Sequence, residues 1–185
     1  IRTGYFSERI MTAPVGLFYG SDTGNTETVA KKIQAELGKN LVDLHDIRKA
    51  KKEDFDPYDF LILGCPTWYQ GELQSDWDAF FPEFQKLNLD GKIVAIFGCG
   101  DQEDYTDYFV NAMGTIRDAV LKDKGVIVGS WPTEGYSFEQ STAVDEDGHF
   151  VGLAIDEDRQ PEKTDERIKK WCNQLREEMC LDQLV

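Results

Sequence analysis

The stretch VGLFYGSDTGNTETVAKKIQAEL, residues 15–37, predicts the fold because it contains one strand, one loop and one helix in succession. Val15–Tyr19 is a short apolar run, which is typical of a buried strand. The loop Gly20–Thr26 that follows is rich in glycine and hydroxyl side chains. Beyond the loop, three apolar side chains recur at helical spacing on one face: Val29, Ile33 and Leu37.

The alternation of strand and helix continues to the end of the chain. Further strands are predicted near residues 41–44, at 60–64, at 93–98 and from 126–129, and further helices at 77–84, 109–120 and 168–179. Pro82 lies inside the first of these helices, which we therefore expect to be short or kinked. This succession predicts an α/β fold, a parallel sheet with helices on both faces. Ligands of such sheets bind outside the carboxyl ends of the strands, so we expect function in the loops after the first, third and fourth strands.

The chain is long enough for one domain and is strongly acidic. Its 185 residues are 41% hydrophobic and 30% charged, which is typical of a globular protein. Lys and Arg total 20 against 35 Asp and Glu, giving a formal net charge of −15. Nucleic acid and anionic membranes would repel such a chain, and no apolar run approaches the roughly 20 residues that span a bilayer. Two interpretations of the acidity stay open: solubility alone, or steering toward basic protein surfaces.

The four cysteines favour neither a metal site nor a redox dithiol. Cys65, Cys99, Cys172 and Cys180 include no C-x-x-C pair, and the two histidines are distant from them in sequence. We therefore expect buried or inert thiols in a reducing cytosol.

The first ten residues carry no clear pattern. They include charged side chains but no apolar core, so they do not resemble a secretory signal. We interpret Met11 as the natural start, residues 1–10 as a cloning remnant or a disordered extension, and residues 11–185 as a single domain.

The loop Gly20–Thr26 has the composition of an anion site. Small residues at the start of a helix leave main-chain N–H groups free for a phosphate, which the helix dipole also attracts. The loop is not a Walker A sequence, because its glycines are too close together and Asn25 stands where lysine is needed. Gly98 and Gly100 do not complete a G-x-G-x-x-G fingerprint, because Glu103 takes the third position. An ordinary helix cap is the alternative interpretation.

Two further loops each carry a large aromatic residue. Pro66–Glu72 follows the third predicted strand and contains Trp68, and Cys99–Tyr105 follows the fourth and ends in Tyr105. Rings in loops are exposed to water unless something stacks on them, and a flat heteroaromatic ligand would do so. Alternatively, the two rings only cover the edge of the sheet. Because three loops converge at that edge, we favour the ligand.

Taken together, these motifs resemble those of the long-chain flavodoxins. The matching stretches are GSDTGNT at 20–26, PTWYQGE at 66–72, GCGDQEDY at 98–105, GSWPTEGY at 129–136 and FVGLAIDED at 150–158. The resemblance runs from about residue 13 to the C-terminus and is strongest to flavodoxins of enteric-type bacteria. It implies a flavodoxin-like three-layer sandwich whose five-stranded parallel sheet has the order 2-1-3-4-5. It also implies an insertion, matched here by residues 132–148, that splits the fifth strand.

The same resemblance implies a site for FMN. Around the phosphate it places Ser21, Asp22, Thr23, Gly24, Asn25 and Thr26. Over the two faces of the isoalloxazine ring it places Trp68 and Tyr105. Along the flavin edge it places Pro66, Thr67, Tyr69, Gln70 and Gly71. At the pyrimidine edge or the ribityl chain it places Cys99, Gly100 and Asp101.

The function that the resemblance implies is electron transfer. The protein is expected to be a low-potential one-electron carrier that cycles mainly between the semiquinone and hydroquinone states of non-covalently bound FMN, and not to be a catalyst on its own. The expected donor is a flavodoxin/ferredoxin–NADP reductase, and the acceptors are other redox enzymes reached by transient electrostatic docking. A cytoplasmic monomer with no metal, membrane or nucleic-acid ligand is expected.

Three other functions compete with this one. An NAD(P)H:quinone reductase of the same fold needs room for a second substrate over the flavin, which Trp68 and Tyr105 would block. A response-regulator-like signalling domain needs acidic residues at the strand ends and a nearby lysine, whereas Gly, Cys and Thr stand there. A domain cut from a larger diflavin reductase is disfavoured, because the chain closes with an amphipathic helix.

Overall fold

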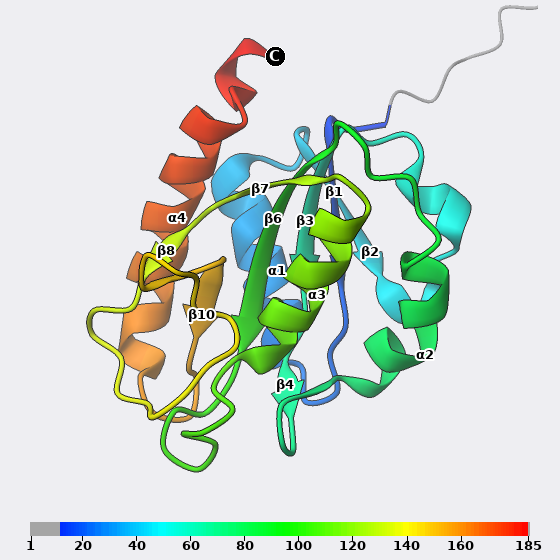
Figure 1. Ribbon diagram of the computed structural model, residues 1–185. Helices are drawn as coiled ribbons and strands as arrows, with labels where there is room; N and C mark the ends of the chain where they lie inside the picture. Colours follow the sequence, from blue (N-terminus) through cyan, green and yellow to red (C-terminus); the bar gives the residue numbers. More distant parts are fainter. Residues whose placement is uncertain (1–11, 185) are drawn as a thin grey trace, which may run out of the picture.

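The computed structural model of the protein describes residues 12–184 (Figure 1). The interpretation of residues 1–10 as an extension, and of Met11 as the start, lies outside the described residues. Within the described part of the chain, no helix combines the length and the apolar character needed to cross a membrane.

The centre of the molecule is a parallel sheet. Its first four long strands are β1 (Val15–Tyr19), β2 (Val42–Asp46), β3 (Phe60–Gly64) and β6 (Ile93–Cys99), and they lie in the order β2-β1-β3-β6. Every residue of β1 is buried, as are most of β3 and β6, because helices cover both faces of the sheet. The predicted fold class is therefore confirmed, including the strand order.

The fifth position of the sheet is shared by two short strands. β7 (Val126–Val128) pairs with the first half of β6, and β10 (Leu153–Ile155) pairs with the second half of the same strand. The chain between them leaves the sheet and forms a small hairpin from β8 (Trp131–Pro132) and β9 (His149–Phe150). The split fifth strand is confirmed, but the insertion extends from residue 129 to residue 152 and is wider than the predicted 132–148.

Four α-helices of the described part of the chain cover the sheet. α1 (Asn25–Leu37) and α4 (Thr164–Glu178) pack against each other on one face, and α2 (Ser75–Phe84) and α3 (Asn111–Lys122) lie on the opposite face (Figure 1). Pro82 stands in the last turn of α2, which is the shortest of these four helices. The remaining elements are short: β4 (Thr67–Trp68), β5 (Glu72–Leu73), η1 (Ile47–Lys49), η2 (Lys52–Phe55), η3 (Pro161–Lys163) and η4 (Leu181–Gln183).

Two buried tryptophans fasten helices to the sheet by hydrogen bonds as well as by packing. The Trp77 indole N–H donates to the carbonyl of Gly64 at 2.7 Å, at the end of β3. The Trp171 indole N–H donates to the carbonyl of Gly129 at 2.8 Å, where the insertion begins. Both side chains are fully buried, so each hydrogen bond satisfies a donor and an acceptor that water does not reach.

The return of the insertion to the sheet predicts a strong steric effect at Gly152. A Cβ atom at this position would overlap the main-chain carbonyl of Ile96 on the neighbouring strand. Gly152→Ala is therefore expected to lower the free energy of unfolding by about 3 kcal/mol, measured by urea denaturation. The control is Gly91→Ala, where a Cβ meets nothing within 4 Å and only the φ of 78° is unfavourable, so a loss of roughly 1 kcal/mol is expected. Equal losses in the two variants would contradict the steric explanation.

Candidate functional site

The loop between β1 and α1 presents free main-chain donors at the helix N-terminus. The residue before the helix, Gly24, has a φ of 93°, and no side chain among residues 12–184 caps the helix. The Ser21 hydroxyl instead accepts a hydrogen bond from the N–H of Gly24 at 3.1 Å. The N–H groups of Thr23, Asn25 and Thr26 donate to no acceptor within the described residues. This geometry fits an anion and argues against the alternative that the loop only caps the helix.

Gln74, which sequence reasoning did not single out, holds this loop in place. Its side chain is fully buried and donates to the carboxylates of Asp22 and Asp76, each at 2.8 Å. Its carbonyl oxygen accepts the N–H of Trp77 at 3.1 Å and so caps α2. The Gln74 amide therefore joins the loop 20–26 to the start of α2, the helix that follows the Trp68 loop.

The Trp68 loop is a tight hairpin between β4 and β5. Trp68 pairs with Glu72, and three residues form the turn between them. Tyr69 has a φ of 47° and Gly71 a φ of 90°, so the turn uses the left-handed region twice. A Cβ at Gly71 would lie 2.8 Å from the Asn111 side chain, and the Thr67 hydroxyl accepts the N–H of Ala112 at 2.9 Å. The hairpin is thus held against the start of α3.

The loop after β6 is stabilised by the side chain of Asp101. Its Oδ1 accepts the main-chain N–H groups of Glu103 and Asp104 at 2.9 and 3.0 Å. The main-chain carbonyl of the same residue accepts the N–H of Tyr105 at 3.1 Å. Burial would raise the pKa of Asp101, but the hydrogen bonds from Arg159, Asp104 and Glu103 outweigh it and lower that pKa. Asp101 therefore stays ionised while its loop presents the Tyr105 ring, which is 43% exposed.

These three loops enclose a cleft of about 340 Å³ at the carboxyl ends of the strands. Ten of the sequence-predicted residues line it: Thr23, Asn25, Thr26, Pro66, Thr67, Trp68, Cys99, Gly100, Asp101 and Tyr105. The cleft falls in the size range of sites for small molecules and cofactors. Trp68 and Tyr105 come from different loops and form two walls of the same cleft.

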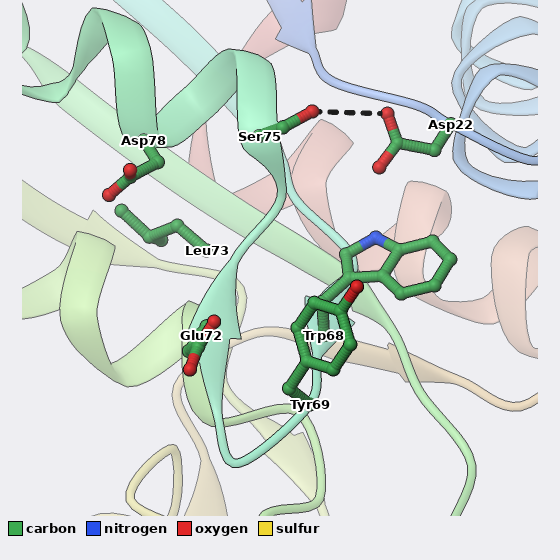
Figure 2. Close-up of a pocket in the computed structure, with 7 residues that line it drawn as sticks. All are labelled: Asp22, Trp68, Tyr69, Glu72, Leu73, Ser75 and Asp78. Atoms are coloured by element: carbon green, nitrogen blue, oxygen red, sulfur yellow. Dashed lines mark hydrogen bonds between the residues drawn. The ribbon is translucent and has the colours of Figure 1, made fainter.

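The other six predicted residues do not line this cleft. Ser21 and Gly24 belong to the helix-start loop, and Gln70 and Gly71 to the hairpin turn. Asp22 and Tyr69 line a second, open pocket of about 710 Å³, which Trp68 also lines. Figure 2 shows this pocket, with Tyr69 beside Trp68 and the Ser75 hydroxyl directed at Asp22. The pocket is acidic, because its remaining walls include Glu72 and Asp78.

Asp158 lines the cleft although sequence reasoning did not place it there. Burial, followed by the charges of Asp101 and Asp156, raises its pKa. The residue follows β10, whose carboxyl end reaches the same edge of the sheet as the other loops. The motif FVGLAIDED at 150–158 and the expected split of the fifth strand were the available signals, but function was expected only in the loops after the first, third and fourth strands.

Fold and site together define a class of protein: an α/β sandwich with the strand order β2-β1-β3-β6 and a fifth position shared by β7 and β10. Its cleft is built from a glycine-rich loop at a helix N-terminus and two loops that carry large aromatic residues. The flavodoxin family model matches residues 17–171, which is most of the chain. The chain therefore belongs to the flavodoxin family.

The relatives include flavodoxins of bacteria. The flavodoxin of Haemophilus influenzae is 60% identical over 94% of this chain and 99% of its own length. Flavodoxin 1 of Escherichia coli is 58% identical over 94% of this chain and 98% of its own length. Among solved structures, Fusobacterium nucleatum flavodoxin bound to flavin mononucleotide has a TM-score of 0.84 and 30% identity, covering 89% of this chain and 97% of that one. The resemblance of the sequence motifs to flavodoxins is thus confirmed, and a response-regulator-like domain is excluded.

The burial of the cysteines predicts which thiols react. Cys65, Cys99 and Cys172 are buried and Cys180 is exposed. Burial raises the pKa of the Cys99 and Cys172 thiols to about 12 and also raises that of Cys65. Because the thiolate is the reactive form, 5,5′-dithiobis(2-nitrobenzoic acid) should modify one thiol rapidly in the native protein and all four after denaturation. A fast-reacting thiol that persists in Cys180→Ser would contradict this assignment.

Proposed function

We propose that the protein is a one-electron carrier that holds FMN non-covalently in the cleft between the loops 20–26, 66–72 and 99–105, within one domain. The observation that carries the proposal is the convergence of these loops on one cleft, with free N–H donors on one wall and two large rings on others. Bound FMN would supply the redox chemistry, because it takes up electrons singly. The residues of the chain would bind it, orient it and keep water from it.

The phosphate of FMN would bind at the start of α1. The loop 20–26 contains no Lys or Arg, so main-chain N–H groups, hydroxyls and the helix dipole would hold the anion. The left-handed Gly24 supports this, because its conformation lets successive N–H groups face one side. A chain with a net charge of −15 would in this way hold a doubly charged phosphate without a salt bridge.

The flavin ring would lie between Trp68 and Tyr105. Trp68 is half-buried, and its indole N–H is buried without a hydrogen-bond partner among the described residues. Two flanking rings would exclude water and would leave no space for a second flat substrate over the flavin. This supports a carrier over the alternative of an NAD(P)H:quinone reductase, whose substrate must stack on the flavin.

A low potential for the second electron is part of the proposal. Asp101 and Asp158 line the cleft, and Asp22, Glu72 and Asp78 line the second pocket, which shares Trp68 with the cleft. A negative charge added to the ring would lie close to these carboxylates in a poorly solvated site. The two reduced states would then be the pair used in electron transfer, because the potential between them is the low one.

Partners would be recognised by charge. The acidic pocket walls Asp22, Glu72 and Asp78 adjoin the exposed Tyr69 at the rim of the Trp68 hairpin. Such a surface supports transient docking of a basic face on a flavodoxin/ferredoxin–NADP reductase and on acceptor enzymes. We also propose that the protein works as a cytoplasmic monomer and is not a catalyst on its own.

The central experiment is titration with FMN followed by stepwise reduction without oxygen. We expect tight 1:1 binding, quenching of tryptophan fluorescence and two separate one-electron steps in the visible spectrum, the first of which gives a blue species. The physical reason is that the acidic cleft disfavours the second electron more than the first. No binding at micromolar FMN would overturn the FMN proposal. Direct bleaching without the blue species would instead favour a two-electron reductase.

A second experiment tests the docking surface. The rate of electron transfer from an NADP-dependent flavoprotein reductase should fall as ionic strength rises. The double variant Glu72→Gln/Asp78→Asn should be slower at low salt and should show a shallower salt dependence. Asp123→Asn is the control, because it follows α3 and lies toward the opposite edge of the sheet. If the double variant kept the parent's salt dependence, docking would not use this pocket.

A further inference from the structure

The loop Gly100–Tyr105 is negatively charged and contains no Lys or Arg of its own. It carries three carboxylates in four positions, at Asp101, Glu103 and Asp104, and it must hold its conformation beside an acidic cleft. Like charges at this spacing repel one another. The Asp101 carboxylate accepts two main-chain hydrogen bonds, which stabilise it, but main-chain N–H groups carry no net charge to offset the three carboxylates.

A single cation from another loop contacts all three carboxylates and offsets part of their charge. Arg159, which follows β10, donates from Nε and Nη2 to the two carboxylate oxygens of Asp101 at 3.0 and 3.1 Å. Its Nη1 lies 3.1 Å from Glu103 Oε2 and its Nη2 lies 3.0 Å from Asp104 Oδ1. These contacts raise the pKa of Arg159, with Asp101 as the main cause.

Burial decides which of the three ion pairs matters. The side chains of Glu103 and Asp104 are 65% and 70% exposed, so water and salt screen their pairs with Arg159. The side chain of Asp101 is only 10% exposed, and its pair is bidentate, which fixes orientation as well as charge. The Asp101 pair is therefore the one that fixes the geometry of the loop.

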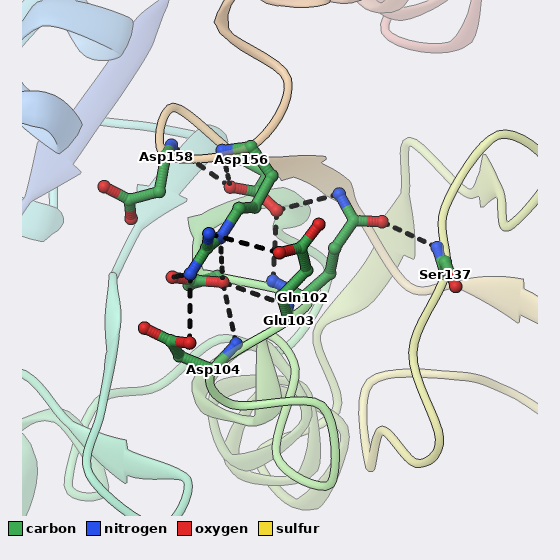
Figure 3. Close-up of polar contacts among 8 residues, drawn as sticks. Gln102, Glu103, Asp104, Ser137, Asp156 and Asp158 are labelled. Carbon is green, nitrogen blue, oxygen red and sulfur yellow. Dashed lines mark hydrogen bonds and ion pairs between the residues drawn. The ribbon is translucent and has the colours of Figure 1, made fainter.

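A buried carboxylate in turn positions Arg159. Asp156 is fully buried, and its Oδ1 accepts the main-chain N–H groups of Asp158 and Arg159 at 3.1 and 2.9 Å. Its Oδ2 accepts the main-chain and side-chain N–H groups of Gln102 at 3.0 and 2.8 Å. Gln102 also accepts the N–H of Ser137 at 2.6 Å, which connects the network to the insertion (Figure 3). The loop Gly100–Tyr105 and the loop after β10 are thus joined at two points, the buried Asp156–Gln102 contact and the Arg159–Asp101 pair.

We propose that Arg159 is a positioning residue for the cofactor: through the bidentate pair with Asp101 it orients the loop that presents Asp101 and Tyr105 to bound FMN, and its charge offsets the carboxylates there. This inference rests on the proposed function. Arg159 itself is not among the residues that line the cleft, so it acts through Asp101. Two consequences can be separated: one of geometry, which needs the planar guanidinium, and one of charge, which any cation would supply.

The test compares Arg159→Gln and Arg159→Lys with the parent protein. Arg159→Gln should raise the Kd for FMN by roughly tenfold and make the potential of the second electron more negative. Arg159→Lys should keep most of the parent's second-electron potential but not recover its Kd, because an ammonium group cannot make the bidentate pair. In the protein without FMN, hydrogen exchange at the amides of residues 102–105 should be faster in both variants.

Lys86→Gln is the control for loss of one positive charge. Lys86 is exposed, pairs only with Glu83 within residues 12–184, and follows α2, whose chain runs away from the cleft edge. Its FMN affinity, second-electron potential and exchange rates should match those of the parent.

Several outcomes would overturn the inference. A Kd for FMN in Arg159→Gln within about twofold of the parent would show that the pair does not position the loop. Full recovery of the Kd by lysine would show that charge alone matters. If the parent itself bound no FMN, the proposed function would fail first, while faster exchange in the Arg159 variants would still report on the loop. Unchanged exchange in both variants would overturn the inference independently of FMN.

Discussion

The register of hydrogen bonds between β1, β3 and β6 determines where every loop of the site begins. Tyr19 is paired with Gly64, and Gly64 with Phe97, so three strands end at nearly the same level. The chain leaves them at Gly20, Cys65 and Gly100, on one edge of the sheet. A shift of one residue between any two strands would turn the side chains of a whole strand to the other face and separate the loops. The cleft therefore depends on main-chain pairing before it depends on any of its own side chains.

Polar side chains from outside the cleft then hold each loop in its conformation. Gln74 binds Asp22 of the first loop, Asn111 packs against Gly71 of the second, and Arg159 binds Asp101 of the third. Gln74 and Asn111 are almost wholly buried, so their hydrogen bonds and contacts are not exchanged with water. The groups that would touch FMN are thereby supported by groups that would not. The same arrangement leaves the N–H groups at the start of α1 without an acceptor in the described part of the chain, which is the feature on which phosphate binding would rest.

The insertion between β7 and β10 is attached to the rest of the protein by more than its two ends. Trp171 binds the carbonyl of Gly129 at its start, the Tyr136 hydroxyl donates to the carbonyl of Ala154 at 2.6 Å, and Ser137 binds Gln102. Tyr136 also lies under the guanidinium of Arg167, with 3.9 Å between the Arg167 Cζ atom and the ring centroid. A segment with this many contacts is part of the fold, and through Gln102 it reaches the loop that carries Asp101.

The sequence by itself determined the order of the elements, the parallel sheet and the three loops, because apolar runs of strand length and helical spacing depend only on neighbouring residues. The resemblance of five motifs to flavodoxins added the strand order and the split of the fifth strand. The limits of the insertion were predicted too narrowly, since the sequence marks polar residues but not the hairpin that Trp131 and Phe150 form. Asp158, Gln74 and Arg159 were not foreseen at the site, because each acts across 50 or more residues of sequence or follows a strand that pairs only in three dimensions. Tertiary structure alone decides such long-range partners, since which carboxylate an amide or a guanidinium meets is set by the register of the sheet and not by local pattern.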